Sequence, residues 1–514
     1  MVPQEEEAMF RDCIDYLLHK RPSTQKEFDA AIIDLRRKHK CTPKKSHLLH
    51  VLQGQILRGA LPEESLWLKK YLVKKSGKSA SGVLVITVLT SPYPKYGGKT
   101  QRFSCKWNCY YCPNEPGQPR SYLHDEPSVI RANRNSFDPI LQFHDRAATL
   151  AMNGHPVDKI EVLVLGGTWT NYPVEYQDSF VRDLFYAANT FQLRDKEKRA
   201  KLSLREEQLI NETAVTKIIG LTLETRPDCI DAEEVKRLRY LGCTRVQLGV
   251  QHTDDEVLAK VNRGCTNADA ERGLKLLMDC CYKVDGHLMP DLPGSTPDKD
   301  WEMLQYVLHS GQLCFDQLKL YPHAVVPWTV TKQWMEEGRF RPMSQEALVE
   351  LLVKFKEKVH PWIRLNRVIR DIPSHYVTNT GYLPNLRQEV LKQMRARGTG
   401  CSCIRCREVQ LDTEAVKRAV LVRRDYTASG GSEVFLSFED QRTDKICAFA
   451  RLRLSPHAGA GVFPELEDTA LIRELHVYGQ LAVSVVAVGS QDSQGSQRST
   501  DSTDSTDSTD STDS

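Results

Sequence analysis

Val83-Leu-Val-Ile-Thr-Val-Leu89 is an uncharged run of apolar and β-branched residues. Such a run is typical of a strand in a parallel sheet that is covered on both faces. Similar runs recur along the chain at 160–165, 218–223, 245–250, 283–289 and 317–321, each separated from the next by enough residues for a helix. The pattern predicts six βα units of the α/β class, and six units favour an open, partial (βα)6 barrel.

A cysteine-rich loop follows the first predicted strand. Its sequence is Ser104-Cys-Lys-Trp-Asn-Cys-Tyr-Tyr-Cys-Pro113, with Cys105, Cys109 and Cys112 in a CxxxCxxC spacing. Iron–sulfur clusters are usually held by four cysteines, so three cysteines leave one iron of a 4Fe-4S cluster for an outside ligand. S-adenosylmethionine is the candidate ligand, because a cluster with this cofactor generates a carbon radical. A zinc knuckle and unliganded buried cysteines are the alternatives, but the interleaved aromatic residues and the strand pattern favour the radical centre.

Glycines and polar residues stand at the ends of the predicted strands, where barrels of this kind gather their chemistry. Glycines let a ligand approach the backbone closely, and the polar groups could bind ribose, adenine or a carboxylate. An ordinary turn and an internal salt bridge are the alternatives for the Gly166 pair and for Glu224 with Arg226. We predict that the cofactor is bound by Gly166, Gly167, Glu224, Arg226 and Gln251, and that Lys319 and Tyr321 are catalytic.

Length and composition exclude some classes of protein. The 514 residues allow two or three domains, and no run of about 18 apolar residues predicts a membrane span. The acidic start, Met1-Val-Pro-Gln-Glu-Glu-Glu7, has no apolar signal core. The 15 cysteines are clustered, which is typical of metal ligands in a reducing compartment. We therefore expect a cytoplasmic protein that contacts no membrane, and a nuclear pool is left open.

The formal net charge of +3 is less informative than its distribution. Clusters of lysine and arginine flank amphipathic helical patterns at 9–18 and 27–35. A basic helical module is the electrostatic footprint of a nucleic-acid partner, with a solvated helix face as the alternative. The clusters are Arg36 to Lys40, Lys44-Lys45, Lys69-Lys70 and Lys74-Lys75.

A second cysteine group, Cys401, Cys403 and Cys406, forms a CxCxxC loop. Three thiolates suit zinc, with a fourth ligand from elsewhere or from water, and a second cluster is the alternative. Candidate fourth ligands are His375, Cys447 and His476.

Alternating apolar residues return at 434–438, 446–454 and 469–479 and predict the antiparallel strands of a small α+β domain. After Val488 a repeated Ser-Thr-Asp sequence cannot bury enough apolar surface to fold. The predicted parts are a basic helical region at 1–78, a barrel at 79–375, a zinc-binding linker at 376–415, an α+β domain at 416–488 and a disordered tail at 489–514.

Over roughly residues 30–480 the chain resembles the family of the Elongator catalytic subunit. This family couples a radical S-adenosylmethionine (SAM) domain to a GNAT-type acetyltransferase domain. The resemblance implies that acetyl-CoA supplies a two-carbon unit to C5 of the transfer RNA (tRNA) wobble uridine, giving 5-carboxymethyluridine after hydrolysis. The segments that carry it are Lys159-Ile-Glu-Val-Leu-Val-Leu-Gly-Gly-Thr168, Glu224-Thr-Arg-Pro-Asp228, Gly242-Cys-Thr-Arg-Val-Gln-Leu-Gly-Val-Gln251, Asn262-Arg-Gly264, His287-Leu-Met-Pro-Asp-Leu-Pro293, Leu318-Lys-Leu-Tyr-Pro322, Arg370-Asp-Ile-Pro373, Leu421-Val-Arg-Arg-Asp-Tyr426 and Arg473-Glu-Leu-His-Val-Tyr-Gly479.

The resemblance also implies roles for residues and partners. The basic N-terminal region would grip the anticodon arm, and other Elongator subunits would be partners in a eukaryote. The first cysteine loop would hold the cluster. Acetyl-CoA would be bound by Lys159 together with Glu474, Leu475, His476 and Val477.

The chain departs from the family pattern after Gly479. The family continues into a glycine-rich loop whose backbone amides bind the coenzyme A phosphates, whereas here Gln480-Leu-Ala-Val-Ser-Val-Val-Ala-Val-Gly489 and the Ser-Thr-Asp repeat follow. We therefore expect a truncated acetyltransferase domain. The alternative functions are a tRNA-binding scaffold with the radical SAM fold but without catalysis, and a radical enzyme with a different substrate.

Overall fold

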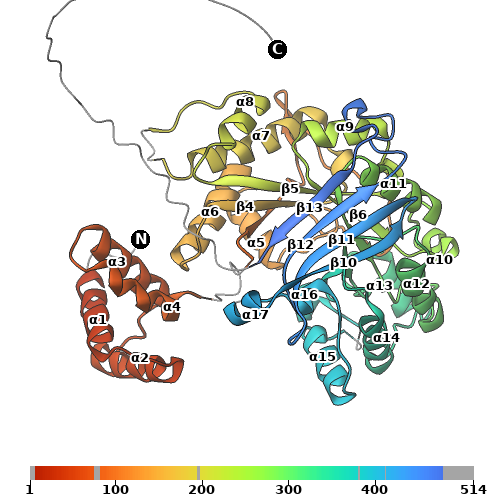
Figure 1. The fold of residues 1–514 in the computed structure, drawn as a ribbon. Helices are drawn as coiled ribbons and strands as arrows, with labels where there is room; N and C mark the ends of the chain where they lie inside the picture. The colour runs from red at the N-terminus through yellow and green to blue at the C-terminus, as the bar shows by residue number, and fades with distance from the viewer. Residues whose placement is uncertain (1–5, 75–80, 194–196, 380–381, 411, 479–514) are drawn as a thin grey trace, which may run out of the picture. The chain divides into compact units, whose positions relative to one another are not determined.

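A computed structural model describes residues 6–74, 81–193, 197–379, 382–410 and 412–478 (Figure 1). All of them belong to one compact unit. The predicted tail at 489–514 and the departure from the family pattern after Gly479 lie outside the described residues. In the described part of the chain, no helix is long and apolar enough to cross a membrane.

A parallel sheet of seven strands forms the centre of the described chain, and its strands are hydrogen-bonded in the order in which they occur along the sequence. The prediction of a partial parallel barrel is confirmed, and each of the six predicted strands is present. The seventh strand was missed. The strands are β1 (Leu84–Leu89), β4 (Lys159–Leu165), β5 (Lys217–Thr225), β6 (Arg245–Gln251), β7 (Lys283–Leu288), β8 (Gln317–Leu320) and β9 (Arg364–Arg367). A short hairpin of β2 (Lys95–Tyr96) and β3 (Lys99–Thr100) follows β1.

Most of the helices between the strands, and one helix after the last strand, contribute residues to the core on the apolar face of this sheet. Alternate strand residues such as Ile86, Val162 and Val246 are fully buried in the same core as residues of these helices. Several helices begin at an N-cap side chain; Ser203 and Thr266 each form a capping box. The helices are α5 (Pro127–Arg134), α6 (Pro139–Met152), α7 (Val174–Thr190), α8 (Leu204–Asn211), α9 (Ala232–Tyr240), α10 (Asp255–Lys260), α11 (Asn267–Asp279), α12 (Pro297–His309), α13 (Val330–Glu336), α14 (Gln345–Lys358) and α15 (Leu386–Ala396).

The N-terminal residues form a small helical module with its own core. The core includes Phe10, Leu17, Phe28 and Leu52, all at most 2% exposed. Its helices are α1 (Glu7–Lys20), α2 (Gln25–His39), α3 (Lys45–Leu57) and α4 (Lys69–Leu72), so the two predicted helical patterns correspond to α1 and α2.

A four-stranded antiparallel sheet follows the short helices α16 (Ile404–Arg407) and α17 (Thr413–Lys417), as the alternation predicted. Its outer face exposes several apolar residues, with Leu475 at 74% and Ile472 at 68% exposure. Its other face carries buried arginines and carboxylates. The strands are β10 (Val420–Ala428), β11 (Gly431–Asp440), β12 (Lys445–Leu454) and β13 (Leu471–Val477).

A buried ion network fastens this antiparallel sheet to the parallel sheet. Arg473 on β13 makes two 2.7 Å ion-pair contacts with Asp316, which precedes β8, and a 2.8 Å contact with Glu433 on β11. Arg453 on β12 lies 2.7 Å from Asp279 at the end of α11. Arg451 completes the network through Glu474 at 2.9 Å. These side chains are almost fully buried, so their charges are balanced by one another rather than by water.

Candidate functional site

The cysteine loop lies beyond the carboxyl end of β1, and every thiol in it meets a hydrogen-bonding side chain. The Thr168 hydroxyl lies 3.6 Å from Cys105 Sγ. Arg120 Nε donates to Cys112 Sγ at 3.4 Å. Cys109, only 6% exposed, receives hydrogen bonds from Arg226 Nη1 at 3.7 Å and Arg263 Nη1 at 3.8 Å.

The segment 261–264, after α10, holds this loop in place. Tyr110 N donates to Val261 O at 3.0 Å, and Asn262 Nδ2 donates to Asn108 O at 3.1 Å. The Trp107 ring covers Gly264 so closely that a Cβ there would lie 2.2 Å from the ring. Only glycine therefore fits at position 264.

The environment of Cys109 favours its thiolate, whereas burial raises the pKa of Cys112. Burial raises the pKa of Cys109, but the guanidinium groups of Arg263 and Arg226 outweigh it and hold the pKa below its ordinary value. The thiolate is the form of cysteine that binds a metal. The sulfur atoms of Cys105, Cys109 and Cys112 do not all lie within 4.8 Å of one another, whereas those of Cys401, Cys403 and Cys406 do. Around a single tetrahedral ion, the thiolate sulfurs lie about 3.8 Å apart when each metal–sulfur bond is about 2.3 Å. The wider spacing of the sulfurs in the first cysteine loop therefore fits an iron–sulfur cluster better than a single ion.

The predicted glycines after β4 have a packing role. Gly166 has φ +130° and Gly167 has φ +113°. A Cβ on Gly166 would lie 2.0 Å from Thr90 Oγ1, and one on Gly167 would lie 3.0 Å from the Phe103 ring. Their backbone conformation and close packing therefore require glycine whether or not a ligand approaches them.

The predicted residues Glu224, Lys319 and Tyr321 lie together on the polar face of the parallel sheet. Glu224 Oε1 is 3.5 Å from His287 Nδ1, and the His287 ring meets the Tyr321 ring edge-on. Burial raises the pKa of Glu224, but His287, Lys319 and Arg370 together hold it below its ordinary value. Burial lowers the pKa of Lys319 although Asp285 lies 3.7 Å away.

More polar groups share this face than the sequence predicted. Arg245, Gln247 and Asp285 alternate with buried apolar residues on β6 and β7, a two-residue period that was visible in the sequence. Within the described chain, Gln247 Oε1, Asp285 Oδ1 and His287 Nε2 are buried without a hydrogen-bond partner. Buried polar atoms are normally satisfied, so these three are candidates to bind a ligand.

Gln251 and Arg226 also lie at strand ends. Gln251 has φ +75°, and its side chain turns towards Gly249. Arg226 forms an internal salt bridge, the alternative considered for it: its Nε pairs with Asp228 at 2.8 Å. Its Nη1 also reaches Cys109.

The predicted acetyl-CoA residues do not form one cluster of free side chains. Lys159 is exposed at the start of β4, whereas Glu474 is ion-paired with Arg451. Leu475 and Val477 point to the exposed face of the antiparallel sheet, and the His476 ring stacks on Phe449 at 5.6 Å.

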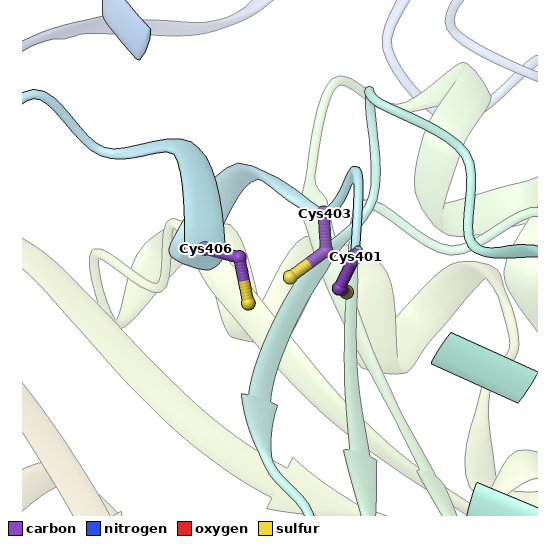
Figure 2. A group of neighbouring side chains, drawn as sticks. All are labelled: Cys401, Cys403 and Cys406. Atoms are coloured by element: carbon purple, nitrogen blue, oxygen red, sulfur yellow. The ribbon is translucent and has the colours of Figure 1, made fainter. Parts of the chain in front are cut away.

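The second cysteine group is compact. Figure 2 shows Cys401, Cys403 and Cys406 with their thiols turned towards one another, and their sulfur atoms lie within 4.8 Å. Hydrogen bonds from the other two thiols lower the pKa of Cys403 well below its ordinary value. The fully buried Lys356 of α14 donates from Nζ to Cys406 Sγ at 3.7 Å. The sequence did not predict a role for Lys356, because a lysine in such an amphipathic helix is expected on the face exposed to solvent.

Among the described residues, no fourth side chain joins this group. The predicted fourth ligands have other surroundings. His375 Nε2 lies 3.0 Å from Asp125, Cys447 is buried on β12, and the ring of His476 on β13 stacks on Phe449 of β12.

Comparisons with known proteins agree with this architecture. Residues 103–307 match the radical SAM superfamily, and residues 315–396 match the radical SAM C-terminal domain. Members of that superfamily use a 4Fe-4S cluster with S-adenosylmethionine, which implies these two cofactors here.

Similar proteins cover most of the chain. The tRNA uridine(34) acetyltransferase of Dehalococcoides mccartyi is 38% identical over 412 residues, which are 79% of this chain and 85% of that protein. Elongator complex protein 3 of Schizosaccharomyces pombe is 36% identical over 450 residues, 84% of this chain and 79% of that protein. The structure of the archaeal Methanocaldococcus infernus Elp3 with an N-terminal deletion gives a TM-score of 0.66 at 35% identity and covers 78% of this chain and 85% of that chain. The chain therefore belongs to the family that contains Elongator complex protein 3 and the tRNA uridine(34) acetyltransferases.

Proposed function

We propose that this chain carboxymethylates the wobble uridine of tRNA, using acetyl-CoA as the carbon source and radical SAM chemistry as the means of activation. One observation carries the proposal. Three cysteines, each in contact with a hydrogen-bonding side chain, lie at the carboxyl end of a parallel sheet. The chain that carries them has relatives named tRNA uridine(34) acetyltransferase.

The polar face of the parallel sheet is our proposed reaction chamber. Lys319 and Tyr321 would contact the reacting groups, since both lie beside Glu224 and His287 at the same end of the sheet as the cysteine loop. The orphaned polar atoms of Gln247 and Asp285 would bind the substrate there. When bound, the cluster and its cofactor supply the radical.

SAM and acetyl-CoA would bind to different parts of the chain. We assign SAM to the strand ends that carry Gly166, Gly167, Glu224, Arg226 and Gln251. For acetyl-CoA we propose Lys159 and the strand Glu474 to Val477. The ion network holds Glu474 and with it the position of this strand relative to the barrel.

The basic N-terminal module is the proposed tRNA surface. Arg36, Arg37 and Lys40 are exposed at the end of α2, and Lys44 is exposed before α3. Exposed cations of this kind bind the phosphate backbone and release counterions, so binding depends strongly on salt.

The test combines tRNA binding with product formation. The triple reversal Arg36→Glu, Arg37→Glu, Lys40→Glu should weaken tRNA binding more than tenfold and lower the salt slope by about 2 to 3, because each lost phosphate contact removes about 0.7 to 0.9. Binding is measured by fluorescence anisotropy at several salt concentrations. Formation of 5-carboxymethyluridine from acetyl-CoA and SAM is measured by mass spectrometry of digested tRNA.

Exposed Arg205→Glu on α8 serves as the matched charge reversal and should change neither result. Unchanged binding in the triple variant would place the tRNA surface elsewhere. Binding of tRNA with neither SAM cleavage nor modified uridine would favour the scaffold alternative over the enzyme.

We also propose that Cys401, Cys403 and Cys406 bind zinc and that Lys356 balances the charge of the thiolates. Replacing Lys356 with methionine keeps the buried volume but removes the cation. Loss of such an outer partner typically costs about 10–100-fold in metal affinity, so zinc should pass to a competing chelator at a correspondingly lower chelator concentration. The exposed Lys354→Met, one half-turn away on α14, is the control. Equal zinc retention in wild type and Lys356→Met would refute the role of Lys356.

A further inference from the structure

Arg263 is a buried cation without a carboxylate partner in the described part of the chain. It is 5% exposed and lies on the segment between α10 and α11. Its Nη2 donates to the Gly249 carbonyl, its Nη1 donates to Cys109 Sγ at 3.8 Å, and its Nε has no partner among the described residues. An isolated buried charge is strongly unfavourable, so the fold must provide an anion at this position.

Arg226, which follows strand β5, reaches the same sulfur atom. It is 2% exposed, and its Nη1 lies 3.7 Å from Cys109 Sγ. Asp228 neutralises Arg226 through a 2.8 Å ion pair, and Arg226 Nη2 donates to the Arg263 carbonyl at 2.6 Å. The Arg226 guanidinium is thereby fixed to the backbone of Arg263, and both guanidinium groups contact one thiol. Only the charge of Arg263 is left without a carboxylate.

The three thiols are not equivalent in this respect. Cys105 meets a neutral hydroxyl from Thr168, and Cys112 meets the partly exposed Arg120. Cys109 alone meets two buried guanidinium groups. Positive charge is therefore concentrated on one side of the cysteine loop, away from bulk water.

We infer that Arg263 is the internal counter-ion of the iron–sulfur centre and, with Arg226, raises its reduction potential. A 4Fe-4S core of charge 2+ held by three thiolates has a net charge of −1, and uptake of one electron from a low-potential donor makes it −2. A fixed cation beside Cys109 stabilises the added negative charge, most strongly where water is excluded. Hydrogen bonds to cluster sulfurs and net charge are known determinants of such potentials.

The geometry separates this role from simple packing. Gly264 and Asn262 already fasten the segment to the cysteine loop through Trp107 and Asn108. Arg263 contributes hydrogen bonds to Gly249 and Cys109 and a charge, but no ion pair with a carboxylate in the described chain. A reduction potential responds to that charge, whereas it would not respond to a residue that only fills space.

The test is a dithionite titration of the reconstituted full chain, followed by electron paramagnetic resonance, without SAM, tRNA or acetyl-CoA. At the potential where half of the wild-type centres are reduced, Arg263→Gln should lower the ratio of reduced to oxidised centres about tenfold. That ratio corresponds to a shift of about 59 mV for a one-electron couple. Arg263→Lys, which keeps the charge, should stay close to wild type. Exposed Arg205→Gln should not change the ratio.

The outcomes are distinct from those that test the tRNA activity, because neither tRNA nor acetyl-CoA is present. An unchanged midpoint in Arg263→Gln with full iron content would overturn the inference. If Arg263→Gln assembles no centre, Arg263→Lys decides: a loaded centre with a near-wild-type potential supports the role of charge. A folded Arg263→Lys chain that also assembles no centre would show that the guanidinium shape matters instead, and would overturn it.

Discussion

Replacing Cys105, Cys109 and Cys112 together with alanine is expected to remove the iron–sulfur absorbance and reduce SAM cleavage to background. The three thiols are the sulfur ligands that this loop offers, and Arg226, Arg263 and Arg120 donate to two of them. Without the thiolates no ligand remains at the loop for iron. Iron content is measured after anaerobic reconstitution, and cleavage is measured as 5′-deoxyadenosine by liquid chromatography.

The control for this experiment is Cys41→Ala, which removes an exposed cysteine of the N-terminal module. It should retain full iron and full cleavage. Zinc should also remain in the triple variant, because the group at Cys401, Cys403 and Cys406 is intact. Iron content at the wild-type level in the triple variant would show that the loop does not hold the cluster.

The second large effect is expected from breaking the buried ion network. Arg473→Met removes the guanidinium that contacts both Asp316 and Glu433 and leaves two buried carboxylates without their main partner. Removing one member of a buried ion pair typically destabilises a protein by about 3–5 kcal/mol. We expect the free energy of unfolding of the barrel and its antiparallel sheet to fall by an amount of this order. Denaturant unfolding followed by near-ultraviolet circular dichroism measures the change.

Arg423→Met is the matched control, because Arg423 pairs with Asp425 on the surface of β10. Exposed pairs contribute about 0–1 kcal/mol, so this variant should unfold close to the wild type. An Arg473→Met protein as stable as Arg423→Met would show that the network does not fasten the two sheets.

The same network predicts how stability depends on pH. Burial raises the pKa of Asp316, but Arg473 and Arg451 outweigh it and lower the pKa to about 2. The pKa of an aspartate in the unfolded chain is about 3.9. The stabilisation contributed by Asp316 is therefore fully present above that pH and is lost as the pH falls towards 2. In Arg473→Met the pKa of Asp316 is lowered less, so the acid unfolding transition should move to higher pH. The transition is followed by circular dichroism between pH 2 and 6.

The sequence predicted the strands whose residues form apolar runs. It missed β9, Arg364-Leu-Asn-Arg367, because only one of its four residues is apolar and the others bind polar groups of the sheet and of neighbouring segments. A strand of that composition is stabilised by its neighbours and carries no local periodic signal.

The candidate site was predicted in part for a similar reason. Cysteine spacing is a local signal, and both thiol groups could be located from it. Arg263 acts on Cys109 across a separation of 154 residues, and Lys356 acts on Cys406 across 50 residues. Neither residue has a spacing or period that marks its partner, so only the folded chain brings them together.

The order of the strands also has a consequence for folding during synthesis. Each strand of the parallel sheet pairs with the strand made just before it, so the barrel can grow unit by unit as the chain leaves the ribosome. Arg473 and Arg453 meet Asp316 and Asp279 only across separations of 157 and 174 residues. Contacts across such separations carry a large loop-closure entropy and form late. Asp279 therefore meets Arg453 only after β12 is made, and Asp316 meets Arg473 only after β13 is made, so the network that joins the two sheets can close only when both strands have left the ribosome.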